Sequence, residues 1–298
     1  MTNAGAWIIH SGALGDFTLT LGVIQALRRD GHAPIRVLGR SWYSALAGTD
    51  DGVDHVASID MAPWLRLFGD EPASAVDRLL AGGAPRLVLD LLGVSDAAIA
   101  ALRDADVQCA IRIDTRPLPG DSRHITRQWA DAMEQHGLGV SIAPPRLSSE
   151  TEPNTARDAV IHVGSGGRHK CWPPASWVQV AKQLQCDGLD VTFLLGPTEI
   201  EHTPEATWRA TLSPHGEIVV CPPLDVLKRR IRRAALFLGA DSGVTHVAAA
   251  LGVPTIAVFG ATDPRVWRPL GPHVTALGGL GKWPDADEVL NAIRSLPA

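Results

Sequence analysis

Short apolar runs alternate with amphipathic stretches along most of the chain. Each run suits a buried parallel strand, and the stretches between runs repeat apolar residues every three or four positions, as helices packed on one face do. This alternation predicts an α/β fold in which helices cover both faces of parallel sheets. The predicted strands are 6–10, 35–38, 53–59, 86–91, 107–113, 158–163, 191–195, 217–221, 236–238 and 255–259, and the predicted helices are 17–29, 42–47, 62–68, 73–80, 96–103, 122–136, 177–186, 199–212, 224–234, 244–251 and 285–296.

A proline-rich polar segment without periodicity, 143–157, divides this pattern into two halves. In a chain of 298 residues, the break predicts two doubly wound, Rossmann-like domains that face a cleft. We place the first domain at 1–148, the linker at 149–157 and the second domain at 158–280. The remaining segment, 281–298, contains a helix that we expect to pack back on the first domain.

The stretch 236–269 carries the clearest candidate site. A glycine-bearing turn leads from a strand into a helix, and the first amides of a helix lack partners within it, so they attract an anion. Ser242 and Gly243 would let a phosphate approach this helix end closely, and His246 would point back toward it. Asp241 is acidic and is not expected to face phosphates directly. From this stretch alone, an ordinary strand–helix unit with a Ser or Asp cap is an equal alternative.

Composition describes a globular protein with an ample core. Hydrophobic residues make up 45% and charged residues 20%, and no apolar run reaches the ~18–20 residues that cross a bilayer. The first residues do not resemble a secretory signal. Four scattered cysteines without a CxxC pair indicate free thiols in a reducing compartment. We therefore expect a cytoplasmic protein without a membrane span.

Charge is distributed unevenly. Residues 1–150 contain 13 Lys and Arg against 18 Asp and Glu, a net charge of −5, whereas residues 151–298 contain 14 of each. Nucleic acid is therefore not an expected partner of the first half. Lysine occurs at only four positions, which makes a lysine within a glycine-rich loop, Lys170, conspicuous.

The first glycine-bearing turn, Ser11–Asp16, joins the first predicted strand to a helix. Its glycines at 12 and 15 form GxxG rather than GxGxxG, so a dinucleotide site is weakly supported. Asp16 has two interpretations, a helix cap or a catalytic carboxylate.

The second glycine-rich loop follows the first strand of the second domain. Ser165 and Gly166 offer a hydroxyl and a close approach to the backbone, and Lys170 offers a point charge suited to phosphate, although the loop does not fit GxxxxGK[ST]. A surface loop with an incidental lysine is the alternative. His162, His169 and His246 lack ligand spacing, so no metal site is expected.

Glu199 begins the helix after the next strand, where it would either cap that helix or hold ribose hydroxyls. Leu224, at the start of a later helix, completes the set of donor-binding candidates.

These segments together resemble glycosyltransferase family 9, the ADP-heptose:lipopolysaccharide heptosyltransferase family. The matching motifs are HSGALGD, HVGSGGRHKCWP, LLGPTE and GADSGVTHVAAALGVPTIAVFGATDPRVWRP, which span both halves in the family's order. The resemblance implies the GT-B architecture and an inverting, metal-independent transfer from a nucleotide-diphosphate sugar, with no cofactor.

The resemblance also implies roles for individual residues. Asp16 would be the general base, and Lys170 would balance the charge of the leaving group. The segment containing Asp241, Ser242, Gly243 and His246 would hold the diphosphate sugar. The acid that contacts ribose would be Glu199, with Glu201 as the alternative.

We therefore expect transfer of a sugar, with heptose from ADP-heptose as the best candidate, to an acceptor hydroxyl in lipopolysaccharide or a related glycan. The acidic first half favours an acceptor less anionic than phosphorylated lipid A, which leaves open a glycan, a glycolipid or a small molecule. A lipid acceptor would bring peripheral contact with the inner membrane. The alternatives are a nucleotide-sugar epimerase of the same fold, a Rossmann-type oxidoreductase or a non-catalytic protein that binds sugar nucleotides.

Overall fold

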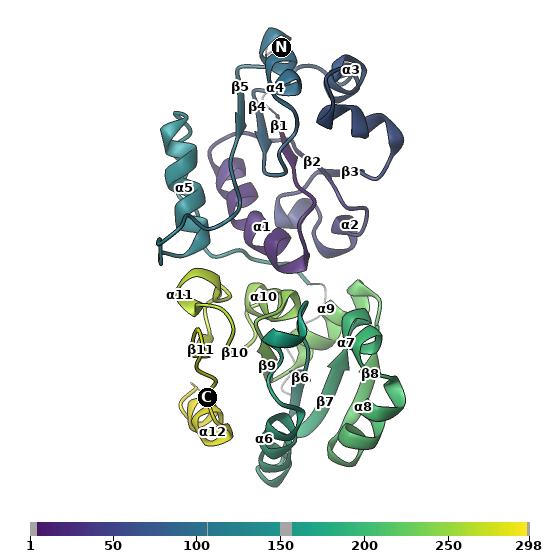
Figure 1. Cartoon of the computed structure of the whole chain (residues 1–298), viewed down its shortest axis with the longest axis vertical. Helices are drawn as coiled ribbons and strands as arrows, with labels where there is room; N and C mark the ends of the chain where they lie inside the picture. Colours follow the sequence, from purple (N-terminus) through teal and green to yellow (C-terminus); the bar gives the residue numbers. More distant parts are fainter. Residues whose placement is uncertain (1–4, 106, 150–156, 297–298) are drawn as a thin grey trace. The chain divides into compact units, whose positions relative to one another are not determined.

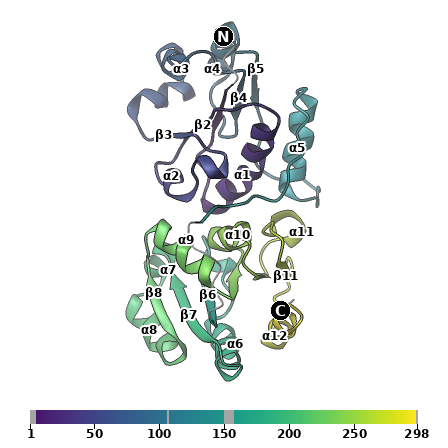
Figure 2. The ribbon, with the colours of Figure 1, turned by 180° about the vertical axis from the view of Figure 1, so that it is seen from behind.

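The computed structural model describes residues 5–105, 107–149 and 157–296. They form two compact units, one built mostly from residues up to 145 and the other mostly from later residues. Figure 1 colours the elements of the first unit from purple to teal and those of the second from teal through green to yellow, and Figure 2 shows them from behind. The predicted linker, 149–157, lies outside the described residues except for its two ends.

The first unit is built on a five-stranded parallel sheet with the order β3-β2-β1-β4-β5. Because all four side chains of β1 are buried, both faces of the sheet are covered, as expected of a parallel sheet. The strands are β1 (Ala6–Ile9), β2 (Ile35–Gly39), β3 (His55–Ser58), β4 (Leu87–Asp90) and β5 (Cys109–Arg112), and the helices are α1 (Leu14–Arg29), α2 (Tyr43–Leu46), α3 (Ala73–Leu80), α4 (Asp96–Asp104) and α5 (Ile125–Gln135), with short 3₁₀ helices η1 (Thr49–Asp51) and η2 (Ala62–Phe68). The first residues of α1, Leu14–Leu19, are grouped with the second unit.

The second unit is built on a six-stranded parallel sheet with the order β11-β10-β9-β6-β7-β8. Counted within the unit, this is the 3-2-1-4-5-6 order of a Rossmann fold. The strands are β6 (Asp158–His162), β7 (Asp190–Leu195), β8 (Glu217–Val220), β9 (Leu236–Ala240), β10 (Thr255–Phe259) and β11 (Val274–Gly278), and the helices are α6 (Pro174–Cys186), α7 (Pro197–His202), α8 (Glu205–Leu212), α9 (Leu224–Arg233), α10 (Gly243–Ala250), α11 (Pro264–Trp267) and α12 (Ala286–Arg294), with 3₁₀ helices η3 (Arg168–Lys170) and η4 (Ser213–His215).

The last helix, α12, belongs to the core of the second unit. Its buried residues Ala286, Val289 and Leu290 join the apolar cluster that α6 forms with one face of the sheet. This corrects the prediction that the helix packs back on the first domain. The amphipathic pattern of α12 required a buried face but did not specify which sheet would cover it.

Several elements differ from the sequence-based expectations. Helix α1 begins at Leu14 rather than Phe17, so Asp16 lies in its first turn. The single helix predicted over 199–212 is two helices, α7 and α8, because Pro204 lacks the amide hydrogen that a continuous helix needs. The strand β11 and the short helix α11 were not predicted. None of the described helices has the length and hydropathy to span a membrane.

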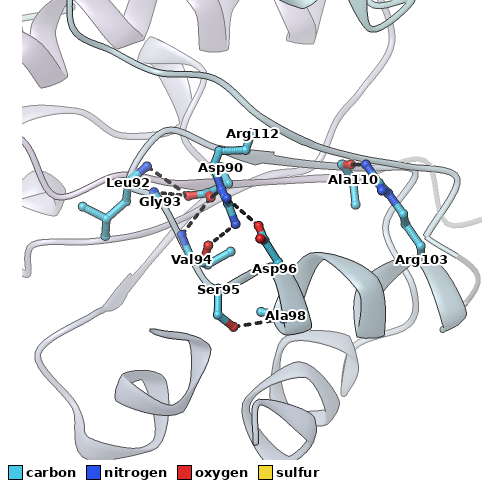
Figure 3. A network of polar contacts seen from close by, with 10 residues as sticks. All are labelled: Asp90, Leu92, Gly93, Val94, Ser95, Asp96, Ala98, Arg103, Ala110 and Arg112. Atoms are coloured by element: carbon cyan, nitrogen blue, oxygen red, sulfur yellow. Dashed lines mark hydrogen bonds and ion pairs between the residues drawn. The ribbon is translucent and has the colours of Figure 1, made fainter. Parts of the chain in front are cut away.

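A buried carboxylate, Asp90, organises the carboxyl end of β4 (Figure 3). Its oxygens accept hydrogen bonds from the amides of Leu92, Gly93 and Val94, at 3.0, 2.9 and 2.8 Å. The Arg112 guanidinium lies 3.0 Å from the same carboxylate and also contacts exposed Asp96 at 2.8 Å. The negative charge is therefore compensated by one guanidinium and three amides, which fix the turn between β4 and α4.

Replacing Asp90 with alanine is expected to lower the free energy of unfolding of the first unit by about 3–5 kcal/mol, because removing one partner of a buried ion pair leaves the others unsatisfied. Urea denaturation measures this change. Asp96→Ala is the matched control, because it removes the other carboxylate that contacts Arg112. The Asp96 side chain is 97% exposed, so its loss should lower the free energy of unfolding by less than about 1 kcal/mol. Equal losses in the two variants would contradict this account.

Candidate functional site

The predicted site residues lie in both halves of the chain. In the first, Asp16 is half-buried in the first turn of α1, where a carboxylate is favourable next to the helix dipole. The preceding segment is held by polar contacts: Tyr43 donates a hydrogen bond to the Gly12 carbonyl at 2.8 Å, and Arg40 donates one to the Ser11 carbonyl at 2.7 Å. The backbone that leads to Asp16 is thus fixed by side chains at the end of β2 and in α2.

His10 lies beneath this turn and is fully buried. Its Nδ1 is 3.0 Å from the Tyr43 hydroxyl. Burial and, to a lesser extent, the positive charge of Arg40 lower the pKa of His10 to about 4, from an ordinary value of 6.5. The imidazole is therefore neutral at physiological pH.

The lowered pKa of His10 makes the stability of the first unit depend on pH. The unfolded chain takes up a proton as the pH falls below 6.5, whereas the folded chain does so only near pH 4, so stability is lost across this interval. Between pH 7 and pH 5, the wild type should lose about 2 kcal/mol more unfolding free energy than His10→Gln. Urea denaturation at both pH values tests this, with exposed His136→Gln as the control that should follow the wild type. Equal pH dependence in His10→Gln and the wild type would refute it.

In the second unit, the candidate residues gather where the strand order reverses. β6 and β9 are neighbours in the sheet, although two strands, β7 and β8, lie between them in the sequence. The helices that follow such strands leave on opposite sides, and ligands of doubly wound folds bind at the carboxyl ends of these strands. The loop after β6 contributes Ser165 and Lys170, and the turn after β9 contributes Asp241 and Ser242.

Asp241 connects the two loops. Lys170 Nζ lies 2.9 Å from Asp241 Oδ2, and Thr262 donates a hydrogen bond to the same oxygen at 2.7 Å. The Ser165 hydroxyl donates to the Asp241 backbone carbonyl. The Asp241 carboxylate is thus engaged by Lys170 and Thr262, and that it does not face phosphates directly stays a prediction. An ammonium has three hydrogens, so Lys170 retains donors for a ligand.

The turn after β9 ends in a capped helix. Ser242 is the N-cap of α10, and its hydroxyl oxygen accepts a hydrogen bond from the Thr245 amide at 3.4 Å. Gly243 is the first residue of α10, and His246 is buried one turn later. The start of α10 therefore combines the amides and the dipole that favour an anion.

Glu199 lies in the first turn of α7 and faces the loop after β6. Its carboxylate accepts a hydrogen bond from the Gly196 amide at 2.6 Å and lies 3.6 Å from His162 Nε2. Burial raises the pKa of Glu199, but His162 and the Gly196 amide outweigh burial, so the pKa lies below its ordinary value and the group is ionised. A side chain at Gly164 would overlap this carboxylate, which explains the glycine. Glu199 thus both caps α7 and presents a negative charge at the site.

Glu199 also lines a cavity of about 270 Å³. Gly164, Trp172 and Trp208 form other parts of its wall. A larger hollow, of about 480 Å³, lies in the first unit and contains none of the predicted site residues.

Two predicted residues make less specific contributions. A Cβ atom at Gly166 would meet no other atom within 4 Å, so there is room for a ligand beside the backbone. Leu224 is the half-buried first residue of α9. Among the residues that the structure describes, no three His, Cys, Asp or Glu side chains are grouped as a metal site would require.

Sequence reasoning missed the connecting role of His162, which it considered only as a metal ligand. The signal was a polar residue at the end of a strand, after three apolar residues and directly before the glycine-rich loop. It also missed Thr262, which lies beyond β10 and joins Asp241 only through the fold.

The fold and these helix ends define an α/β protein of GT-B architecture, made of two Rossmann-like domains. The family model described as Glycosyltransferase family 9 (heptosyltransferase) matches residues 123–291. The chain belongs to this family.

Individual relatives agree with the family assignment. The chain is 33% identical over 105 residues to lipopolysaccharide heptosyltransferase 3 of Escherichia coli, a stretch that covers 34% of this chain and 30% of the relative. The match therefore spans about a third of the length of the curated relative.

Solved structures match nearly the whole chain. The glycosyltransferase family 9 protein of Veillonella parvula superimposes with a TM-score of 0.74 and 17% identity over 99% of this chain and 98% of that one. The E. coli heptosyltransferase WaaC with ADP superimposes with a TM-score of 0.68 and 17% identity over 97% and 98%. At this identity, the likeness establishes the fold.

Proposed function

We propose that the protein is an inverting glycosyltransferase that transfers a sugar from a nucleotide-diphosphate sugar to an acceptor hydroxyl, in lipopolysaccharide or related glycan assembly. The preferred donor is ADP-heptose. The observation that carries this proposal is the contact of Lys170 with Asp241 beside the capped start of α10, at the reversal of strand order. The matched family, the names of its heptosyltransferase members and the ADP in a solved structure of the same fold support the choice of donor.

Each proposed role follows from the chemistry of the side chain. Asp16 removes the proton from the acceptor hydroxyl as it attacks the anomeric carbon from the face opposite the diphosphate, which inverts the configuration. Lys170 and the first amides of α10 stabilise the charge that develops on the departing diphosphate. Glu199, which is ionised, accepts hydrogen bonds from ribose hydroxyls. Because the protein supplies these donors itself, the proposed reaction uses neither a metal nor another cofactor.

The remaining candidates complete the proposed donor site. Ser165 and Gly166 line the diphosphate side, and His246 lies one helical turn from it. We propose that the acceptor is a glycan, a glycolipid or a small molecule, and that its charge is low because the first half of the chain is acidic. A glycolipid acceptor would bring the enzyme to a membrane surface without a span.

The test incubates the full chain with ADP-heptose in buffer containing EDTA, with and without each of a panel of acceptors that runs from weakly charged glycans to lipopolysaccharide of truncated core. We expect acceptor-dependent ADP release that matches sugar incorporation one to one, with an anomeric configuration opposite to that of the donor. Conversion of the donor sugar without ADP release would identify an epimerase instead. Nucleotide binding without turnover on any of a panel of acceptors would identify a binding protein.

A further inference from the structure

His162 connects the two ends of the proposed donor site. It is the last residue of β6 and is 5% exposed. One ring nitrogen, Nδ1, lies 3.1 Å from Ser242 Oγ, and the other, Nε2, lies 3.6 Å from Glu199 Oε2. A single imidazole therefore contacts the residue that caps α10 and the carboxylate proposed to hold ribose.

The surrounding groups determine where the hydrogens of this network lie. Glu199 is ionised, so the nitrogen that faces it, Nε2, carries a hydrogen. In the tautomer with its hydrogen on Nε2, Nδ1 is an acceptor. Ser242 is the partner of Nδ1, and its hydroxyl then donates to the ring. These hydrogen positions are assigned from the network of partners.

A second contact of Ser242 is consistent with this assignment. The Thr245 hydroxyl donates its hydrogen to the Ala240 carbonyl at 2.7 Å. It therefore has no hydrogen left for Ser242, although the two hydroxyl oxygens are 3.0 Å apart. With its own hydrogen directed to His162, Ser242 presents lone pairs to the Thr245 amide, as an N-cap must.

We propose that His162 is a positioning residue for the nucleotide donor. Glu199 fixes the tautomer of His162, and His162 accepts a hydrogen bond from the Ser242 hydroxyl. Ser242 in turn caps the first turn of α10, so that the first amides of that helix are directed at the diphosphate. Ser242 thus acts by capping the helix rather than by donating a hydrogen to phosphate. This inference rests on the proposed function, because it concerns the binding of a nucleoside diphosphate at that site.

The alternative is that His162 only fills space in the core at the end of β6. Leucine has a similar volume and would then serve equally well. Asparagine is the informative replacement, because its amide places a polar atom near the position of Nδ1 and can still bond to Ser242. The two variants separate packing from hydrogen bonding.

The experiment measures ADP affinity by isothermal titration calorimetry and donor KM and kcat on the full chain. His162→Leu is expected to raise the dissociation constant of ADP and the KM about tenfold and to change kcat less than about threefold. His162→Asn should recover most of the affinity. Ser242→Ala should weaken ADP binding about fivefold in the wild type and less than twofold in His162→Leu, because the two residues act through one contact.

Each outcome decides between the inferences. An ADP affinity of His162→Leu within twofold of the wild type would overturn the positioning role, and so would full additivity in the double-mutant cycle. If His162→Leu does not fold, the other two variants decide. Weaker ADP binding by Ser242→Ala together with wild-type affinity in His162→Asn supports the role. Weaker binding by His162→Asn together with wild-type affinity in Ser242→Ala overturns it. A wild type that does not bind ADP would instead reject the proposed function, and this inference with it.

Discussion

Replacing Asp16 with alanine is expected to lower kcat by about 10²–10⁴-fold while ADP affinity stays within twofold of the wild type. The carboxylate lies in the first turn of α1, behind a turn that His10, Tyr43 and Arg40 hold in place. Its proposed role is to accept the acceptor's proton, a step that matters for transfer and not for holding the nucleotide. Steady-state kinetics with ADP-heptose and direct titration of ADP measure the two quantities separately.

Exposed Asp30, directly after α1, supplies the matched control. Asp30→Ala removes a carboxylate at the opposite end of the same helix and should leave kcat and ADP affinity unchanged. Asp16→Ala with more than a few per cent of wild-type activity would rule out Asp16 as the base. A loss of ADP affinity as large as the loss of kcat would assign Asp16 to donor binding instead.

Replacing Lys170 with alanine is expected to lower kcat/KM by about 10²–10³-fold, a range typical of losing one donor that stabilises charge in a transition state. Part of this loss comes from Asp241. Its carboxylate, which Lys170 contacts at 2.9 Å, would remain largely buried next to the diphosphate without its cation. The variant therefore loses an attraction and gains a repulsion.

The repulsion can be tested by a second substitution. Asp241→Asn in the Lys170→Ala background removes the uncompensated charge and should restore ADP affinity at least threefold relative to Lys170→Ala alone. Lys182→Ala, which removes an exposed lysine of α6, is the control and should match the wild type. If the double variant binds ADP no better than Lys170→Ala, the ion pair does not govern donor binding.

Local sequence patterns were sufficient for most of the secondary structure. The bounds of α3 and β10 are those predicted, because each has a clear period and a flanking turn signal. The strand β11 escaped prediction because its residues are only half-buried and its apolar pattern is weak. Pro204 indicates the break between α7 and α8, but the helical pattern of the flanking residues led to the prediction of a single helix.

Long-range relations were not readable from the sequence. Lys170 and Asp241 are 71 residues apart, and only the adjacency of β6 and β9 brings them together. The hydrogen-bond partner of Ser242 is likewise His162, 80 residues away. Motifs identified the residue types for phosphate chemistry, while the pairing that neutralises Lys170 and orients Ser242 depends on the fold. The prediction that α12 packs on the first domain was wrong for the same reason.

The most direct test of the account is a thermal-shift screen of the wild type and Lys170→Ala with ADP, GDP, UDP, dTDP and CMP. A ligand that binds the folded state raises the melting temperature by mass action. We predict a selective rise with ADP in the wild type that is lost in Lys170→Ala. Selectivity for another nucleotide would keep the transferase and discard ADP-heptose as donor, and no rise with any of the five would contradict a nucleotide-sugar site at Lys170 and Asp241.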